Sequence, residues 1–267
     1  MSAPATPPLD KRQVGRAFAR AASSYDGCAV LQREMGRRLL ERLELVRLQP
    51  ATVLDLGCGT GADLPALRQR YPKARLYGLD LALDMLQHCR RRGAGELRWW
   101  RRPGLLCGDL EALPLADAGI DLLYSNAALQ WSNDLPGALA EARRVLRAGG
   151  LAMFTTFGPD TLRELRWAWS QVDSHAHVSP FIDMHDIGDA LLRAGFADPV
   201  MDMEHITLTY DSVNALMRDL KGLGAGNATQ GRSRGLTGKG RMQAMRQAYE
   251  RLRDAGRLPA TYEVVYG

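Results

Sequence analysis

The sequence has little cysteine and no long apolar run. Its four cysteines, Cys28, Cys58, Cys89 and Cys107, form no C-x-x-C pair and show no metal-ligand spacing. Reduced thiols in a cytoplasmic protein are the simplest interpretation. No apolar run approaches the roughly 20 residues that a membrane helix needs, and residues 1–10 lack the apolar segment of a signal peptide. We therefore expect no membrane partner.

Signatures of covalent or metal-dependent catalysis are also missing. The five histidines are scattered, and neither an H-E-x-x-H motif nor a Ser/His/Asp spacing occurs. His175 and His177 form an H-x-H pair, but they lie in an expected loop without a carboxylate at a matching spacing. We interpret them as loop or substrate-pocket residues and expect no metal site.

The composition predicts a globular domain with a basic surface segment. Of 267 residues, 46% are apolar and 24% charged, and the net charge is +5. Basic residues cluster at 90–102, with Trp99 and Trp100 among them. This cluster is either a solvated loop or a docking patch for an acidic partner. Nucleic acid is the weaker alternative, because bases can stack on tryptophan but no RNA-binding module is visible.

A glycine-rich segment is the most informative feature present. The apolar run from Val53 to Leu56 is followed by Gly57, Gly59 and Gly61. Small residues at this spacing let a backbone turn sharply after a strand and approach a ligand closely. The pattern is G-x-G-x-G rather than the dinucleotide fingerprint G-x-G-x-x-G. It predicts a nucleotide-type cofactor site at the end of the first strand.

Alternating strand and helix patterns predict an α/β fold with a seven-stranded, mostly parallel sheet and helices on both faces. A helical N-terminal segment breaks near Ser23-Ser24, and Gly149-Gly150 is expected to close a helix. The predicted strands are 52–57, 74–80, 104–108, 120–125, 150–157, 204–210 and 261–266. The predicted helices are two pieces within 10–48, then 62–71, 82–92, 134–147, 160–172, 185–194, 211–223 and 239–255.

Polar residues follow four of these strands, where such sheets bind ligands. Asp80 is expected to accept hydrogen bonds from ribose hydroxyls, since a carboxylate only accepts and has two oxygens. Asp55 organises the glycine loop or accepts from an ammonium group. The expected cofactor-binding residues are Tyr25, Asp55, Gly57, Gly59, Gly61, Asp80, Leu81, Met85, Asp109, Leu110 and Asn126. Three of these residues also have an alternative role that needs no cofactor. Asp80 could be an ordinary strand-end turn residue, Asp109 could cap a helix, and Met85 could pack in a helix core.

Motif I, Asp55-Leu-Gly-Cys-Gly-Thr-Gly61, resembles that of the class I S-adenosylmethionine (SAM) methyltransferases. Segments from about residue 12 to the C-terminus resemble the malonyl-acyl-carrier-protein O-methyltransferases of biotin synthesis. One of them is Ser125-Asn-Ala-Ala-Leu-Gln-Trp131, and the more specific ones lie in the C-terminal part, Met217-Arg-Asp-Leu-Lys-Gly-Leu-Gly-Ala225 and Leu258-Pro-Ala-Thr-Tyr262. Other segments, such as Phe157-Gly-Pro-Asp-Thr-Leu-Arg-Glu-Leu-Arg166, also resemble a complex I assembly factor thought to hydroxylate an arginine.

The biotin resemblance implies a Rossmann-like fold and SAM as cofactor, with S-adenosylhomocysteine as product. It also implies methylation of the free carboxylate of malonyl-acyl carrier protein or malonyl-CoA. Two alternatives stay open: a methyltransferase for another small acid or a quinone precursor, and a SAM-binding assembly factor. We divide the chain into a disordered lead-in (1–10), an N-terminal helical lid (11–50), the SAM-binding core (51–158) and substrate-side helices with closing strands of the same domain (159–267).

The implied reaction needs alignment rather than a general base, because a malonyl carboxylate is already ionised near neutral pH. Tyr25 and Trp131 are candidates for aligning the substrate. A cation must bind the carboxylate, and the candidates are Lys221, Arg20 and, more weakly, Arg144. Each of these basic residues has a surface ion pair as its structural alternative.

Overall fold

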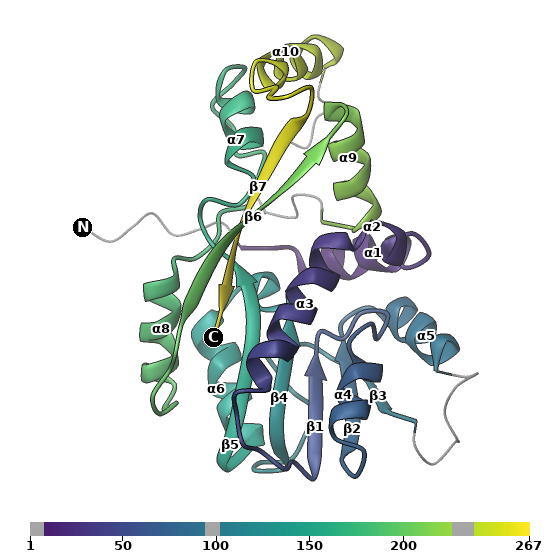
Figure 1. Ribbon diagram of the computed structural model, residues 1–267, viewed down its shortest axis with the longest axis vertical. Coiled ribbons are helices and arrows are strands. Elements are labelled where there is room, and N and C mark those ends of the chain that lie inside the picture. The colour runs from purple at the N-terminus through teal and green to yellow at the C-terminus, as the bar shows by residue number, and fades with distance from the viewer. Residues whose placement is uncertain (1–7, 94–101, 226–237) are drawn as a thin grey trace.

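The computed structural model describes residues 8–93, 102–225 and 238–267. They include one seven-stranded sheet of strand order β3-β2-β1-β4-β5-β7-β6 (Figure 1). Neighbouring strands from β3 to β5 are parallel, and β7 runs antiparallel to both β5 and β6. The predicted seven-stranded, mostly parallel sheet is confirmed. The strands are β1 (Thr52–Leu56), β2 (Arg75–Asp80), β3 (Gly104–Cys107), β4 (Ile120–Asn126), β5 (Leu146–Phe157), β6 (Asp202–Tyr210) and β7 (Leu258–Tyr266).

The helices agree with the expected pattern and cover both faces of the sheet. Three of them precede β1: α1 (Lys11–Ala21), α2 (Tyr25–Cys28) and α3 (Val30–Leu43), so the chain breaks at Ser23-Ser24 as expected. The others are α4 (Leu64–Arg70), α5 (Leu83–Arg92), α6 (Leu135–Val145), α7 (Arg163–Ser170), α8 (Met184–Arg193), α9 (Val213–Gly222) and α10 (Lys239–Glu250), with a short 3-10 turn at Leu129–Trp131.

The prediction that Gly149-Gly150 closes a helix is wrong. α6 already ends at Val145, and the next residue, Leu146, pairs with Ile120 as β5 begins. Both glycines therefore lie within β5, in the stretch between Leu146 and Leu151 where the β4–β5 register shifts. A Cβ on Gly150 would lie 3.2 Å from the Asp121 carbonyl oxygen. The glycine thus permits a close approach of two strands, which a sequence pattern cannot distinguish from a helix stop.

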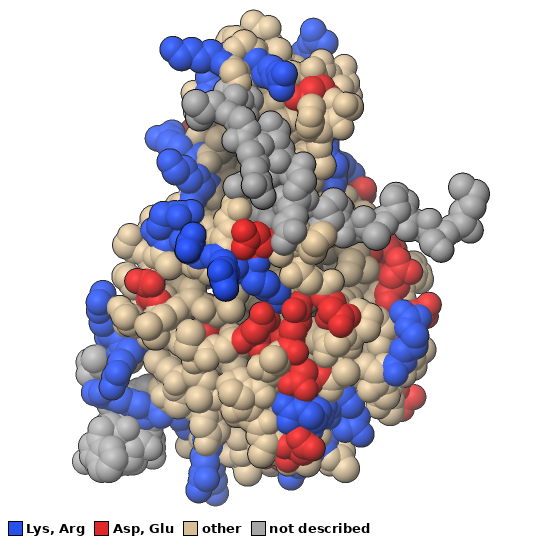
Figure 2. Space-filling view, turned by 180° about the vertical axis from the view of Figure 1, so that it is seen from behind, with Lys and Arg blue, Asp and Glu red and all other residues tan. Residues whose placement is uncertain are grey.

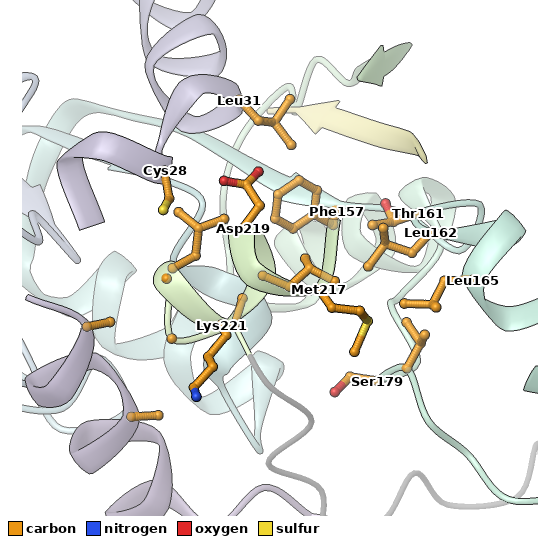
Figure 3. A pocket seen from close by; sticks show the side chains of 18 of the residues that line it. Cys28, Leu31, Phe157, Thr161, Leu162, Leu165, Ser179, Met217, Asp219 and Lys221 are labelled. Atoms are coloured by element: carbon orange, nitrogen blue, oxygen red, sulfur yellow. The ribbon is translucent and has the colours of Figure 1, made fainter. Parts of the chain in front are cut away.

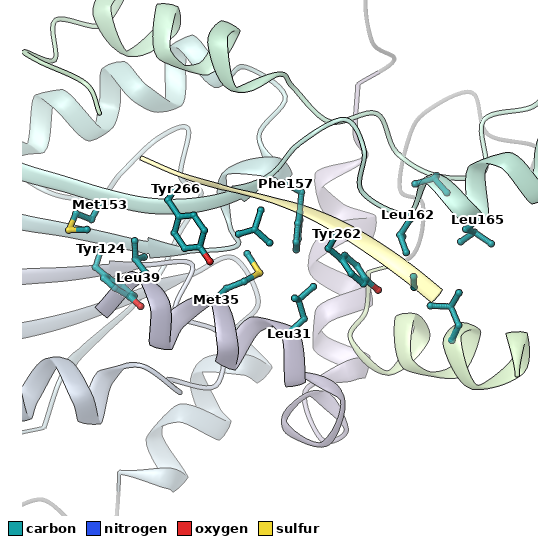
Figure 4. Packing of buried hydrophobic residues seen from close by; sticks show 14 of the residues in the cluster. Leu31, Met35, Leu39, Tyr124, Met153, Phe157, Leu162, Leu165, Tyr262 and Tyr266 are labelled. Carbon is teal, nitrogen blue, oxygen red and sulfur yellow. The ribbon is translucent and has the colours of Figure 1, made fainter. Parts of the chain in front are cut away.

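Alternating residues of the central strands point to opposite faces of the sheet and build two cores. Val53 and Leu122 share one cluster with α3 and α4, and Leu54 and Leu123 share another with α6. α3 buries Leu31, Met35 and Leu39 against the sheet near Tyr124 and Met153 (Figure 4). This packing fixes the N-terminal helices over the carboxyl ends of β1 and β4.

The β6–β7 hairpin is longer than its pairing with the rest of the sheet. β7 pairs with β5 only through residues 264–266, whereas it pairs with β6 along its whole length. The remaining part of the hairpin, residues 206–210 and 258–262, projects above the sheet (Figure 1). Helices α7, α9 and α10 pack on it, and we call this assembly the outer lobe. α9 of the outer lobe contacts α2, and a cavity described below lies between the outer lobe and the N-terminal helices.

None of the helices in the described part of the chain combines the length and the apolar character needed to cross a bilayer.

Candidate SAM and substrate site

The glycine loop after β1 is shaped by contacts that leave no room for side chains. Gly57 has φ +77°, and a Cβ there would collide with Ala128. Gly61 has φ +74°, and a Cβ there would collide with the Cys89 thiol. Gly57 N–H donates to Leu79 O at 2.7 Å, which braces the loop on β2. Gly57 and Gly59 line a cleft, whereas Gly61 lines neither of the two cofactor cavities described below. We therefore infer that Gly61 serves packing rather than direct contact.

Asp80 stands at the end of β2, where the sequence placed it. Its carboxylate accepts hydrogen bonds from Gly59 N–H (2.9 Å) and Ala82 N–H (2.8 Å), one on each oxygen. Burial raises its pKa above the usual value, although these two backbone donors oppose the shift. Each carboxylate oxygen can accept a further hydrogen bond. Asp80 is thus oriented for an outside pair of donors such as the ribose hydroxyls.

A small cavity of about 70 Å³ opens beside Asp80. It brings together most of the residues predicted for the adenosine half of the cofactor. Lys11 Nζ lies 2.8 Å from Asp109 Oδ1, and Glu111 N–H donates to the same oxygen at 3.1 Å. Asp109 therefore shapes a turn rather than capping a helix, and because it also borders the cavity its contact with the cofactor stays a prediction. The predicted residues lining this cavity are Tyr25, Gly57, Gly59, Asp80, Leu81, Met85, Asp109, Leu110, Asn126 and Trp131.

A second cavity, of about 360 Å³, lies on the other side of the glycine loop. Asp55 and Asp63 both line it, and burial raises the pKa of each carboxyl group. No described residue donates a hydrogen bond to the Asp55 side chain, which is only 2% exposed. Gln32 Oε1 is likewise buried without a partner among the described residues. Unpaired acceptors and buried acids are costly unless a cation binds there, so this cavity suits an ammonium or sulfonium ligand.

Asn126 borders both cavities, but its side chain is already engaged. Nδ2 donates to Gln32 O (2.9 Å) and to Asp63 (3.0 Å), and Oδ1 accepts from the Thr155 hydroxyl at 2.7 Å. We therefore assign Asn126 to tying α3 to the ends of β4 and β5. The sequence analysis missed Asp63, Gln32 and Thr155. Asp63 follows Gly61 by two residues, which is the signal that could have found it; the other two carry none.

Aromatic side chains separate the cofactor cavities from a third, larger cavity. Tyr25 borders both cofactor cavities, and its pKa is raised by burial and by the nearby Asp80 and Asp63. The Phe18 ring meets Trp131 edge-on at 5.1 Å and Tyr25 at 6.5 Å between centroids. Trp131 lines the small cofactor cavity on one side and the third cavity on the other. A methyl acceptor in the third cavity would thus reach the cofactor past Trp131.

The third cavity, of about 800 Å³, lies between the N-terminal helices and the outer lobe. Its walls are largely apolar, with Phe157, Leu162, Leu165 and Met217 among them, and Lys221 extends from the end of α9 at one side (Figure 3). Arg20 of α1 also lines it. Neither cation forms an ion pair with any residue that the structure describes. An apolar cavity with unpaired cations suits an uncharged chain that ends in a carboxylate.

Arg144 is ruled out as the carboxylate-binding cation. Its guanidinium is bound by Glu141 (2.7 Å) and Asp117 (2.6 Å) and by two loop carbonyls. It lines none of the three cavities. The weaker sequence candidate was therefore wrong, because Arg144 anchors the loop before β4 to α6.

His177 lines the third cavity, in agreement with the substrate-pocket interpretation. Its ring stacks on Trp169 at 3.6 Å, and Nε2 lies 2.8 Å from Asp173 Oδ1. The other possible ligand cluster in the described part of the chain is Asp160, His205 and Glu263, whose candidate atoms lie within 4.8 Å of one another. Arg163 lies 3.6 Å from Asp160 and Glu263 already accepts from the Asp160 N–H, which disfavours a metal there. The basic segment 90–102 falls mostly outside the described residues.

Comparison with known proteins defines the class. A family model described as "Methyltransferase domain" matches residues 54–154, which span the glycine loop to β5. A putative methyltransferase from Bacillus halodurans shares the fold, with a TM-score of 0.60 and 18% identity over 85% of this chain and 96% of that one. The chain therefore has the class I methyltransferase fold and contains a methyltransferase domain. SAM is the cofactor of that class. The unpaired acceptors and buried acids described above fit that cationic cofactor.

Sequence relatives narrow the class to a family. The malonyl-[acyl-carrier protein] O-methyltransferase of Laribacter hongkongensis is 56% identical over 97% of this chain and 88% of that protein. The protein of the same name from Gallionella capsiferriformans is 51% identical over 97% of this chain and 90% of its own length. The chain belongs to the malonyl-[acyl-carrier protein] O-methyltransferase family.

Proposed function

We propose that this enzyme transfers a methyl group from SAM to the free carboxylate of malonyl-acyl carrier protein. The observation that carries the proposal is the third cavity. It is apolar along its walls, adjoins the cofactor cavities through Trp131, and has Lys221 and Arg20 at its edge. A thioester-linked malonyl group on a flexible arm has the matching chemistry, an uncharged stem with a terminal carboxylate. The names of the relatives support the same acceptor.

The chain's own residues would hold the cofactor by complementary charge. Asp80 would accept from the ribose hydroxyls, and Asp109 with the Leu110 backbone would contact the adenine. Asp55, Asp63 and Gln32 would surround the ammonium group. Bound SAM supplies a methyl group already activated by the sulfonium charge.

The described site residues bind and align rather than move a proton. A malonyl carboxylate is ionised near neutral pH, so no base must act before it attacks the methyl carbon. Lys221 or Arg20 would hold the second carboxylate oxygen and fix the direction of attack. Trp131, Phe18 and Tyr25 would exclude water between the two cavities, which strengthens the charge interactions inside them.

We propose that residues 11–50 act as a lid on the core formed by 51–158, with 159–267 forming the acceptor side. α1 borders both the small cofactor cavity and the third cavity, so SAM enters when these helices move. The four cysteines are free thiols, which agrees with a proposed cytoplasmic location.

The test is transfer of radiolabel from methyl-labelled SAM to malonyl-acyl carrier protein, followed by mild base. The proposal predicts label that base releases, as expected for a methyl ester. Malonyl-CoA, a quinone precursor and an arginine-containing protein serve as competing acceptors. Label on the quinone precursor or on the arginine-containing protein, with none on either malonyl thioester, would overturn the proposal. It would favour the quinone-precursor methyltransferase or the assembly factor instead.

A further inference from the structure

The two faces of α1 have opposite chemistry. Val14, Phe18 and Ala21 face the protein, where Val14 and Ala21 are buried. Arg12, Arg16 and Arg20 recur every four residues, so they share the opposite face. All three arginines are exposed. The helix that roofs the cofactor cavity therefore presents a continuous basic stripe to solvent.

The guanidinium groups of these arginines have no interaction partner among the described residues. None of the three forms an ion pair or a hydrogen bond with a residue that the structure describes. Lys11 on the same helix differs, because it contacts Asp109 and Glu111 at 2.8 and 3.1 Å. Like charges spaced four residues apart destabilise a helix slightly, so the stripe does not contribute to folding. It is available to an outside anion.

Further basic residues, on α9 as well as α1, line the third cavity. Arg218 and Lys221 on α9 are exposed and line the cavity, and Arg20 lines it from the side of α1. Lys and Arg side chains form a band at the level of α1 that continues up the side carrying α9 (Figure 2). Basic residues of two helices, α1 and α9, thus border the cavity that we propose for the substrate arm.

The described part of the basic segment 90–102 is less suitable as a docking surface. Arg90 and Arg91 on α5 are exposed, but they line none of the three cavities. Arg92 is bound to Asp26 of α2. A carrier held on α1 would contact a helix that lines the third cavity, whereas no residue of α5 lines that cavity.

We propose that Arg12 and Arg16 of α1, with Arg218 of α9, form the docking surface for the acyl carrier protein, while Arg20 and Lys221 remain the candidates for binding the malonyl carboxylate. The inference rests on the proposed function, because it takes malonyl-acyl carrier protein as the substrate. A carrier protein with an acidic surface would be complementary to these arginines, and opposite charges also speed the encounter of two proteins. Docking on a lid helix would also place the carrier where it holds α1 over the cofactor.

The experiment compares two charge-reversed double variants on two substrates. Arg12→Glu/Arg16→Glu reverses the charge of two of the three stripe residues and leaves Arg20, which lines the third cavity, unchanged. Arg90→Glu/Arg91→Glu makes the same charge change on α5. Malonyl-acyl carrier protein tests docking, and malonyl-pantetheine, which has neither protein nor phosphate, reports the site alone. Circular dichroism and SAM affinity establish that both variants are folded, with Arg12→Gln/Arg16→Gln as a milder substitute.

The inference predicts that Arg12→Glu/Arg16→Glu raises KM for the carrier substrate at least about tenfold at low salt. Its KM for malonyl-pantetheine should stay within about twofold, and the α5 variant should match wild type on both substrates. The wild-type KM for the carrier should also rise with salt, because exposed charges are screened. An unchanged carrier KM in the α1 variant, or a larger effect in the α5 variant, would overturn the inference. Failure of wild type on both substrates would instead refute the proposed function.

Discussion

The backbone N–H of Gly59 donates a hydrogen bond to the Asp80 carboxylate across 2.9 Å. Gly59 lies in the loop after β1 and Asp80 at the end of β2, so the two parts of the nucleotide motif are joined before any ligand binds. The bond fixes the direction in which the carboxylate can accept further donors. Because the carboxylate is already oriented, we expect its loss to weaken cofactor binding.

Asp80→Ala should weaken SAM binding by roughly tenfold to a hundredfold, because hydrogen bonds to a charged group are worth about 1.5–3 kcal/mol each. Isothermal titration calorimetry gives the affinity. Asp84→Ala, an exposed acid in the first turn of α5, is the matched control and should bind normally. Retained affinity in Asp80→Ala would refute the ribose assignment.

Gly36→Ala should disturb the cofactor site from the opposite side. A Cβ on Gly36 would lie 2.6 Å from Asp63 Oδ1 and 2.7 Å from Asn126 Nδ2, so α3 or both polar groups must shift. Overpacking of this kind costs about 1–3 kcal/mol. Thermal unfolding and SAM affinity should both fall. Gly27→Ala, where nothing lies within 4 Å of the new Cβ, should change neither; equal behaviour of the two variants would contradict the packing of α3.

Asp55→Asn should separate stability from binding. Burial and the neighbouring Asp63 raise the Asp55 pKa in the folded protein, so the folded state holds more protons than the unfolded state above about pH 4. This carboxyl group therefore lowers the free energy of unfolding of the SAM-free protein as pH rises from there towards the folded-state pKa. Asparagine does not ionise, so the variant keeps the unfolding free energy that the wild-type protein loses at higher pH. The melting temperature of the SAM-free variant at neutral pH should therefore exceed that of the wild type by about 2–4 °C.

The same Asp55→Asn substitution should weaken SAM binding at least about tenfold, because a neutral amide no longer attracts the ammonium group. Wild-type affinity should increase with pH as Asp55 and Asp63 lose protons, and this dependence should be smaller in the variant. Melting curves with and without SAM across pH provide both quantities. A variant that is less stable and binds SAM normally would contradict the assignment.

Lys221→Ala should raise KM for the malonyl substrate by roughly tenfold or more while SAM affinity stays unchanged, if Lys221 is the cation that binds the carboxylate. Arg20→Ala, measured in the same way, tests the competing candidate. Arg193→Ala on α8, an exposed arginine that lines none of the three cavities, is the control. Unchanged KM in both Lys221→Ala and Arg20→Ala would exclude the two cations proposed here.

The sheet and most of the cofactor cleft could be predicted because strand ends converge by topology. Once β1, β2 and β4 are parallel neighbours, Gly57, Asp80 and Asn126 must meet at one edge. The side-chain assignments were less predictable. Asn126 lies where we expected it, but its side chain forms hydrogen bonds with Gln32, Asp63 and Thr155. These partners are available only because α3 packs across the strand ends.

Long-range packing also explains the errors. The sequence could not show which basic residue is free to bind a carboxylate, because Arg144 and Lys221 are both cations. Only the fold brings Asp117 and Glu141 to Arg144 and leaves Lys221 without an ion pair among the described residues. The third cavity was equally hidden in the sequence. It exists because β6 and β7 run past the sheet and hold α9 opposite α1, a relation between residues about 200 positions apart.

The most direct measurement is mass spectrometry of carrier proteins after reaction with SAM carrying a deuterated methyl group. Malonyl- and acetyl-acyl carrier protein differ only in the free carboxylate, so they are matched acceptors. The account predicts one labelled methyl ester on the malonyl arm and no label on the acetyl arm. Equal labelling of both carriers, or no labelling of the malonyl carrier by a protein that binds SAM, would contradict it.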